Sequence, residues 1–295
     1  LGNQLVSGFF PNKIPNPDLK WERTGQFDIG LDLGLFNNRL RITTDYYKKK
    51  TTDLLYSVAV PATSGYQTML KNIGSIENQG YELSIESDNL TGAFSWTTAF
   101  NIAFNRNKVL ELGGEEYKEM AEGDGHLKTG SVRRLIVGEP IGVFYGYRFD
   151  GIFQNEEECK QQTSSASPIG VGLRRYKDLN GDGKVDAAND REILGDANPK
   201  FFGGLTNTFA YKGFELNVFL QYSYGNKILN YNAMELENPT GGQNAYADMV
   251  NRWTPENPSN IYPKATTNRA LLVSDRFIED GSYLKLKTLS LSFLK

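Results

Sequence analysis

The chain has 295 residues, a formal net charge of −3, 12% aromatic residues and 30 glycines. Acidic and basic residues are mixed along it, so it lacks the large basic face of a nucleic-acid-binding protein, and no nucleic-acid partner is expected. It contains no run of about 18 apolar residues, which excludes a transmembrane helix, and its single cysteine excludes an internal disulfide. The first residues lack the basic-then-apolar pattern of a signal peptide. We therefore expect either a cytosolic protein or a piece of a mature exported one.

Long strands with strict alternation of apolar and polar residues recur along the chain. In QFDIGLDLGLF, Phe27, Ile29 and Leu31 begin a series that alternates with aspartate and glycine. Seven such strands are predicted, at 27–35, 40–48, 80–88, 93–105, 203–211, 214–224 and 283–294. Asn37-Asn38, the stretch NLTG and Lys212-Gly213 form the turns of three hairpins, because these residues tolerate tight-turn conformations.

The lengths of the strands and of their connections indicate a membrane barrel. A tilted transmembrane strand needs roughly 9–11 residues, whereas strands of globular proteins usually have about 5 or 6. Short turns alternate with long connections at about 49–79, 107–200 and 226–282, as in barrels with short periplasmic turns and long extracellular loops. Spanning strands run alternately inward and outward, and strand 203–211 must run inward because a short turn follows it. By this parity argument, the alternating stretch IGVFYGYRFDGIF belongs to the extracellular excursion 107–200 and is not a lone spanning strand. A soluble β-sandwich also alternates, and it stays open as the alternative.

Seven spanning strands are too few, and odd in number, for a single-chain bacterial barrel. An open sheet edge is also prohibitively unfavourable in lipid. We therefore predict an all-β fold that forms a segment of an antiparallel transmembrane β-barrel, with the remaining strands outside this chain.

Several stretches resemble the SusC/RagA-type TonB-dependent transporters of Gram-negative bacteria. They follow the family's order and include NPDLKWERTGQFDIGLDLGLFNNRLRITTDYYKKKTTDLL, NIGSIENQGYELSIES, GEPIGVFYGYRFDGIFQ, YKDLNGDGKVD and YLKLKTLSLSF. The resemblance implies that residues 1–295 are the C-terminal part of a 22-stranded barrel, and that the plug domain is absent from this chain. It also implies TonB-dependent uptake of glycans or peptides across the outer membrane. The implied partners are a SusD-like surface lipoprotein, the TonB complex and outer-membrane lipid.

The stretch KDLNGDGKVDAANDREILGD is similar to an EF-hand calcium loop. The oxygen ligands predicted for Ca²⁺ are Asp178, Asn180, Asp182, Lys184 through its carbonyl group, Asp186 and Asp190. The twelfth position, which should be a bidentate acid, is Asn189, so Asp190 becomes a ligand only if the loop bulges by one residue. An Asx-rich turn without metal also explains these residues, and both interpretations stay open.

Aromatic residues in the long connections are candidates for ligand binding, because flat rings stack on sugar faces. These candidates are Tyr145, Tyr147, Tyr231, Tyr246 and Trp253. Packing within the loops or a membrane girdle also explains each ring. The chain shows no nucleophile–base pair and no phosphate-binding glycine loop, so an enzyme is not expected. The alternative function is a soluble calcium-dependent glycan-binding β-sandwich.

Overall fold

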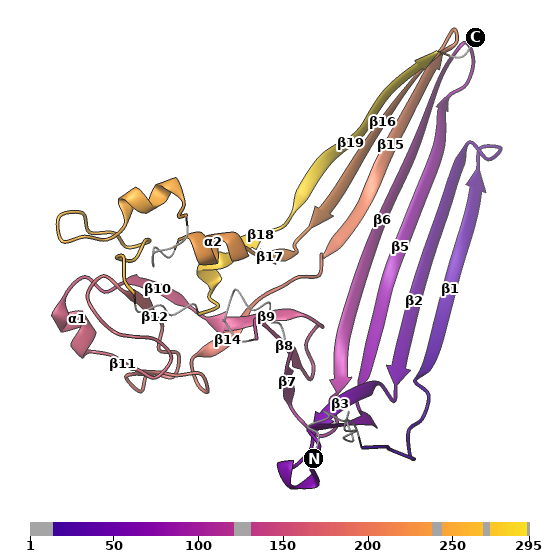
Figure 1. Ribbon diagram of the computed structural model, residues 1–295. Coiled ribbons are helices and arrows are strands. Elements are labelled where there is room, and N and C mark those ends of the chain that lie inside the picture. The colour runs from indigo at the N-terminus through magenta and orange to yellow at the C-terminus, as the bar shows by residue number, and fades with distance from the viewer. Residues whose placement is uncertain (1–13, 121–130, 238–243, 268–271, 294–295) are drawn as a thin grey trace, which may run out of the picture.

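The computed structural model describes residues 14–120, 131–237, 244–267 and 272–293. Its main feature is an antiparallel sheet in the order β1-β2-β5-β6-β15-β16-β19, in which each strand pairs with the next (Figure 1). The strands are β1 (Arg23–Leu35), β2 (Leu40–Thr52), β5 (Ser75–Leu90), β6 (Phe94–Glu111), β15 (Phe201–Tyr211), β16 (Phe214–Tyr224) and β19 (Tyr283–Phe293). The seven strands predicted from the alternation are confirmed, although position 294 lies outside the described residues.

β5 and β6 extend further toward the long connections than the alternation predicts. Ser75 starts β5 and pairs with Glu111, which ends β6. The predicted boundaries at 80 and 105 are therefore wrong, and the excursion predicted from 107 begins only after Glu111. Polar pairs such as Asn78 and Asn107 occupy the added rungs, so backbone pairing continues where the apolar alternation has stopped.

Tight turns join the hairpins at the end of the sheet opposite the long connections (Figure 1). Asn37 and Asn38 have φ values of 58° and 63°, and Phe36 joins them at 54°. Lys212 and Gly213 have φ values of 46° and 85°. The predicted turns are confirmed at both places, and left-handed backbone suits the twist of a hairpin.

The two faces of the sheet differ in polarity. Cross-strand pairing sets apolar residues side by side on one face, in a row formed by Leu33, Ile42, Ile85, Phe100, Leu205, Leu220 and Leu286. This apolar face is uncovered: Ile29 is 59% exposed, and no second sheet in the described part of the chain packs against it. The opposite, polar face carries rows such as Asp32, Thr43, Ser84 and Asn101.

Two aromatic rows bound the apolar face. The excursion-end row consists of Tyr46, Tyr81, Phe104, Phe201 and Tyr224. The turn-end row consists of Phe94, Trp96, Phe209, Tyr211, Phe214 and Phe293. Ten residues of β6 separate Phe94 from Phe104, which corresponds to about 33 Å along the strand. At the usual tilt of barrel strands this spacing gives a band about 25 Å tall, the height of the lipid-facing band of outer-membrane barrels.

The long connections form small structures of their own. The first contains β3 (Leu55–Ala59), a 3₁₀ turn (Ala62–Ser64) and β4 (Thr68–Asn72). The second, which we call the middle excursion, contains β7 (Tyr117–Glu119), β8 (Arg133–Ile136), β9 (Val143–Tyr147), β10 (Phe149–Ile152), α1 (Glu156–Lys160), β11 (Thr163–Ser164), β12 (Arg174–Tyr176), β13 (Lys184–Val185) and β14 (Arg191–Asp196). The last excursion contains β17 (Lys227–Leu229), α2 (Tyr231–Leu236), 3₁₀ turns at Ala247–Asn251 and Asp275–Phe277, and β18 (Ile278–Asp280). β9 belongs to a sheet of order β14-β9-β8-β7, outside the seven-stranded sheet, as the parity argument predicted.

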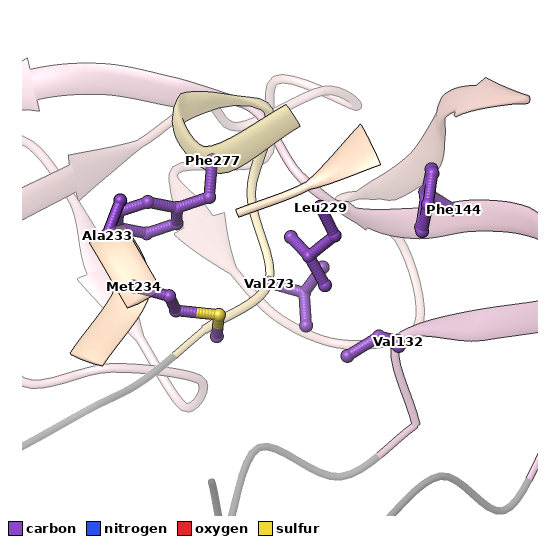
Figure 2. Packing of buried hydrophobic residues seen from close by; sticks show 7 residues of the cluster. All are labelled: Val132, Phe144, Leu229, Ala233, Met234, Val273 and Phe277. Carbon is purple, nitrogen blue, oxygen red and sulfur yellow. The ribbon is translucent and has the colours of Figure 1, made fainter. Parts of the chain in front are cut away.

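The middle and last excursions share a hydrophobic core, and we call the pair the loop module (Figure 2). The core is formed by Val132, Phe144, Leu229, Ala233, Met234, Val273 and Phe277. Met234 and Phe277 are almost fully buried, so this module has an interior of its own beyond the end of the sheet. In the described ranges, no helix is long and apolar enough to cross a membrane.

Candidate functional site

The loop 178–190 connects β12 to β14 and contains all the predicted calcium ligands. The carboxylate of Asp178 accepts hydrogen bonds from the N–H groups of Gly181 and Gly183, at 2.7 and 2.6 Å. Gly183 has a φ of 82°, a conformation that residues with a side chain rarely adopt. Asp178 and the two glycines therefore form a tight turn that closes on its own backbone.

Asp186 organises the second half of this loop. Its Oδ1 accepts from the N–H groups of Ala188 and Asn189, both at 2.9 Å, and its Oδ2 lies 3.1 Å from Nζ of Lys184. The bond from Asn189 is the main cause of a pKa for Asp186 below the usual aspartate value, and Lys184 and Ala188 lower that pKa further. The carboxylate therefore stays ionised well into the acid range.

Asp190 ties the two halves of the loop together. It is fully buried, and its two oxygens accept from the N–H groups of Leu179 and Asp186 at 2.8 and 2.7 Å. A carboxylate that accepts two backbone bonds satisfies donors that would otherwise be left unpaired in a buried position. Asp190 thus has a structural role that the sequence comparison with an EF-hand did not indicate.

The side-chain oxygens of the predicted calcium ligands form hydrogen bonds within the loop itself. Asn180 accepts from the Asp182 N–H at 3.2 Å, and Asp182 accepts from the Lys184 N–H at 2.8 Å. Together with Asp178, Asp186 and Asp190, these side-chain oxygens are engaged by the loop's own donors. Within the described residues, no three acidic, histidine or cysteine side chains come together as a metal cluster. In this arrangement the loop is an Asx-rich turn, and calcium binding stays a prediction.

The candidate ligand-binding aromatics are spread over the loop module. The Tyr147 ring is buried and lies 5.6 Å from that of Tyr176. Tyr231 packs against the shared core, and Trp253 donates its Nε1–H to Gln154 at 3.0 Å. These rings are engaged in internal packing.

Tyr246 and Tyr145 have different surroundings. Tyr246 is 37% exposed and is the most open of the five rings. Tyr145 is half-buried and stacks on the guanidinium of Arg134, whose carbon lies 3.8 Å from the ring centre. The five rings therefore do not form one continuous stacking surface.

Arg134 is a buried residue that the sequence analysis did not identify. Its guanidinium lies between the rings of Tyr117 and Tyr145, 3.9 and 3.8 Å from their centres, and it pairs with Glu119. Burial alone would raise the pKa of Glu119. The hydrogen bond from Arg134 and the positive charges of Arg134 and Arg191 outweigh burial, so the pKa of Glu119 lies below its usual value. This sandwich fixes β7, β8 and β9 to one another. The stretch SVRRLI has no spacing that indicates it.

A second buried polar cluster joins the two excursions. Arg174 from β12 donates to the backbone carbonyl of Glu237, and Arg276 pairs with the Glu237 carboxylate at 3.0 Å. Burial is the main influence on both partners: it lowers the pKa of Arg174 and raises that of Glu237. Nearby, Asp275 accepts from the Phe149 N–H at 2.7 Å. The excursions are therefore connected by polar contacts as well as by their core.

The polar face of the sheet is acidic over β1, β2 and β5. Its carboxylates are Asp28, Asp32, Asp45, Glu82, Glu86 and Asp88. Asp45 and Glu82 lie directly opposite each other, an unfavourable pair of like charges. Arg41 offsets two of the others, 3.1 Å from Glu86 and 3.2 Å from Asp88. This face is suited to water and polar solutes.

The chain is similar in sequence to TonB-dependent receptors. Residues 2–125 match the family model described as TonB dependent receptor-like, beta-barrel. The chain is 40% identical over 294 residues to TonB-dependent receptor P3 of Formosa agariphila, an alignment that covers 99% of this chain and 29% of the relative. It is 28% identical over 291 residues to TonB-dependent receptor SusC of Bacteroides thetaiotaomicron, covering 95% of this chain and 27% of that relative. The chain thus spans less than a third of these curated relatives.

Solved structures show the same likeness. The structure of the RagAB peptide transporter matches with a TM-score of 0.74 at 26% identity, over 94% of this chain and 29% of the matched chain. The RagAB peptide importer in its open-open state matches with a TM-score of 0.73 at 25% identity, over 96% of this chain and 29% of that chain. Because nearly the whole chain is covered, the similarity includes the loop module as well as the sheet.

Proposed function

This chain belongs to the β-barrel family of TonB-dependent receptors, and on that premise we propose that it forms part of the wall and outer mouth of an outer-membrane importer. The whole protein takes up glycans or peptides in a TonB-dependent manner. The observation that supports this best is the uncovered apolar face between two aromatic rows, with a polar face behind it. A band of this height between aromatic girdles fits a bilayer.

The soluble β-sandwich alternative requires a second sheet over the apolar face, and the strands of the described residues form none there. In a sandwich, the apolar face of each sheet is buried against the other. Here Leu31 and Leu33 of β1 are 53% and 41% exposed, and Leu289 and Leu291 of β19 are 65% and 70% exposed. Such an apolar surface is unfavourable in water and suited to lipid. The relatives are also named as receptors and transporters rather than enzymes.

The open edges of the sheet support a larger barrel. β1 and β19 each pair on one side only among the described strands. An unpaired edge in lipid leaves backbone N–H and C=O groups without partners. We infer that further strands close the sheet, and that the complete barrel has the 22 strands and the plugged lumen of outer-membrane transporters.

The loop module supports the assignment of an outer mouth. It lies beyond the excursion end of the sheet and has its own core, so it is a preformed surface at the barrel entrance. We propose that a SusD-like lipoprotein contacts this module and that its exposed residues, Tyr246 among them, meet the substrate. The acidic polar face then lines the path through the lumen, and the TonB complex supplies energy from the periplasm.

The experiment that tests this topology uses the full-length receptor in intact cells. In a Cys159→Ser background, Glu157→Cys places a thiol on α1 of the loop module, and Thr91→Cys places a matched exposed thiol in a hairpin turn. A membrane-impermeant maleimide should label position 157 in intact cells and position 91 only after the outer membrane is permeabilised. Equal labelling of both positions in intact cells would show that the chain does not span the outer membrane as proposed.

Uptake is tested in the same strain. Deletion of the receptor gene should abolish growth on the glycan or peptide that it imports, and the Glu157→Cys receptor should restore that growth. A deletion strain that grows like its parent on every glycan and peptide of a panel would contradict an import function while leaving the labelling result unaffected.

A further inference from the structure

A group of basic residues lies on the apolar face of the sheet, just beyond the excursion-end aromatic row. We call Lys48, Lys50, Arg106 and Lys108 the rim cations. The register places Lys48, Gln79 and Arg106 on one rung and Lys50, Glu77 and Lys108 on the next. Because side chains on a strand alternate between faces, these residues point to the same side as the aromatic row, toward lipid.

The rim cations carry excess positive charge. Lys48 lies 3.2 Å from Glu77, the one carboxylate on these rungs. Lys50, Arg106 and Lys108 are exposed, and the carboxylates of the described residues form no ion pair with them. Four cations and one carboxylate give this patch a local charge of +3, whereas the whole chain has −3.

A groove connects the rim cations to the apolar face. It has a volume of about 330 Å³ and is lined by Tyr46, Gln79, Gly80, Tyr81, Phe104 and Arg106. Three of the lining residues are aromatic, and Gln79 and Arg106 are polar. A molecule that fits it therefore has an anionic group joined to an apolar body.

We propose that the rim cations and this groove bind the phosphate-bearing headgroup of an anionic lipid in the outer leaflet, with the acyl chains along the apolar face. The inference depends on the membrane placement proposed above, and it assigns the occupant by charge complementarity. Nη1 of Arg106 donates to the backbone carbonyl groups of Asn105 and Lys200, both at 3.0 Å, which holds the guanidinium at the rim. Its positive charge attracts phosphate oxygens, and Lys50 and Lys108 supply further charge. The bound lipid holds the three strands β2, β5 and β6 at a fixed depth.

The proposal is tested on the full-length receptor in detergent, with lipid binding followed by native mass spectrometry. The probes are dioleoylphosphatidylglycerol, which is anionic, and dioleoylphosphatidylcholine, which has no net charge. The triple variant Lys50→Gln, Arg106→Gln, Lys108→Gln should bind the anionic lipid at least tenfold more weakly than the parent. The matched control Lys49→Gln, Lys160→Gln, Lys285→Gln removes three positive charges elsewhere, from the polar face and α1, and should bind like the parent.

Folding is checked by resistance to SDS without heating, which every variant should retain. Equal binding of the two lipids by the parent, or equal loss in the control variant, would overturn the headgroup site. A change of oligomeric state in the rim variant without a change in lipid binding would overturn it in favour of contact with a second copy. None of these outcomes affects the labelling or growth results, so the lipid site and the proposed function are tested independently of each other.

Discussion

Arg174 donates a hydrogen bond of 3.1 Å to the backbone carbonyl of Glu237, 63 residues further along the chain. Both residues are buried, and they come from different excursions. The bond therefore connects two segments that β15 and β16 separate in the sequence. Together with the shared core, it joins the two excursions into one packed module.

Replacement of Arg174 by alanine should loosen the loop module and leave the barrel folded. Without the guanidinium, the carbonyl group of Glu237 loses its hydrogen bond while the Glu237 carboxylate keeps Arg276, and we expect a loss of about 1–3 kcal/mol. Hydrogen exchange on the full-length receptor should show reduced protection of 227–236 and 272–280 but not of β5 or β6. Arg175→Ala is the matched control, because the neighbouring Arg175 is only partly buried in its pairs with Asp150 and Glu158. Equal protection in both variants would contradict the role of Arg174.

The Arg134 sandwich should not tolerate lysine. Arg134→Lys keeps the positive charge, but an ammonium group does not stack on both tyrosine rings as a planar guanidinium does. We expect a loss of about 2 kcal/mol in the local stability of β7 and β8, the range of a desolvated cation–π contact. Hydrogen exchange at 133–136 measures it. Arg148→Lys, at an exposed ion pair with Glu192, should change protection little; a larger effect there than at Arg134 would refute the sandwich as the source of stability.

The loop 178–190 should lose stability in acid through Asp186. Its pKa in the folded loop is lowered, first by the Asn189 N–H bond and then by Lys184. A carboxylate with a lowered folded pKa contributes stability that is present above its unfolded pKa, near 3.9, and is lost as pH falls through the folded pKa. Proteolysis at the loop should therefore be slower in the parent than in Asp186→Asn at pH 6, and the difference should close below about pH 4. A difference that stays constant with pH would contradict this ionisation.

Calcium binding by the same loop is a separate prediction from the sequence. Asp178→Ala with Asp182→Ala should abolish calcium binding measured by calorimetry on the full-length receptor, because both carboxylates are among the predicted ligands. The matched control, Glu156→Ala with Glu157→Ala, removes two carboxylates from the first turn of α1 and should leave binding unchanged. Calcium affinity that is the same in both double variants would reject the loop as the site.

How much the sequence predicts depends on the range of the contacts involved. Alternation in stretches such as that of Phe27 and Ile29 is a local pattern, so it identified all seven long strands and two tight turns. The loop module depends on residues far apart in the chain: Phe144 and Phe277 share a core although no short-range pattern relates them. Asp190 shows the same limit, since its burial follows from the fold of the whole loop and not from its place in a calcium motif.

Gly80 supports the barrel wall through a close approach on the polar face. The Tyr47 side chain crosses over it and donates to Oδ1 of Asn105 at 3.0 Å, and a Cβ on Gly80 would lie 2.6 Å from the Tyr47 hydroxyl and 2.5 Å from the Phe104 carbonyl oxygen. A glycine within a strand permits such an aromatic cover, which a larger residue would displace. Gly80→Ala should therefore destabilise the full-length barrel by about 1–3 kcal/mol, the range of overpacked sites. Gly25→Ala is the matched control because no atom lies within 4 Å of a Cβ there. The temperature at which the receptor loses SDS resistance should fall for Gly80→Ala alone, because alanine at an open strand position such as Gly25 restricts only the unfolded chain. An equal fall for Gly25→Ala would show that the Tyr47 contact is not the cause.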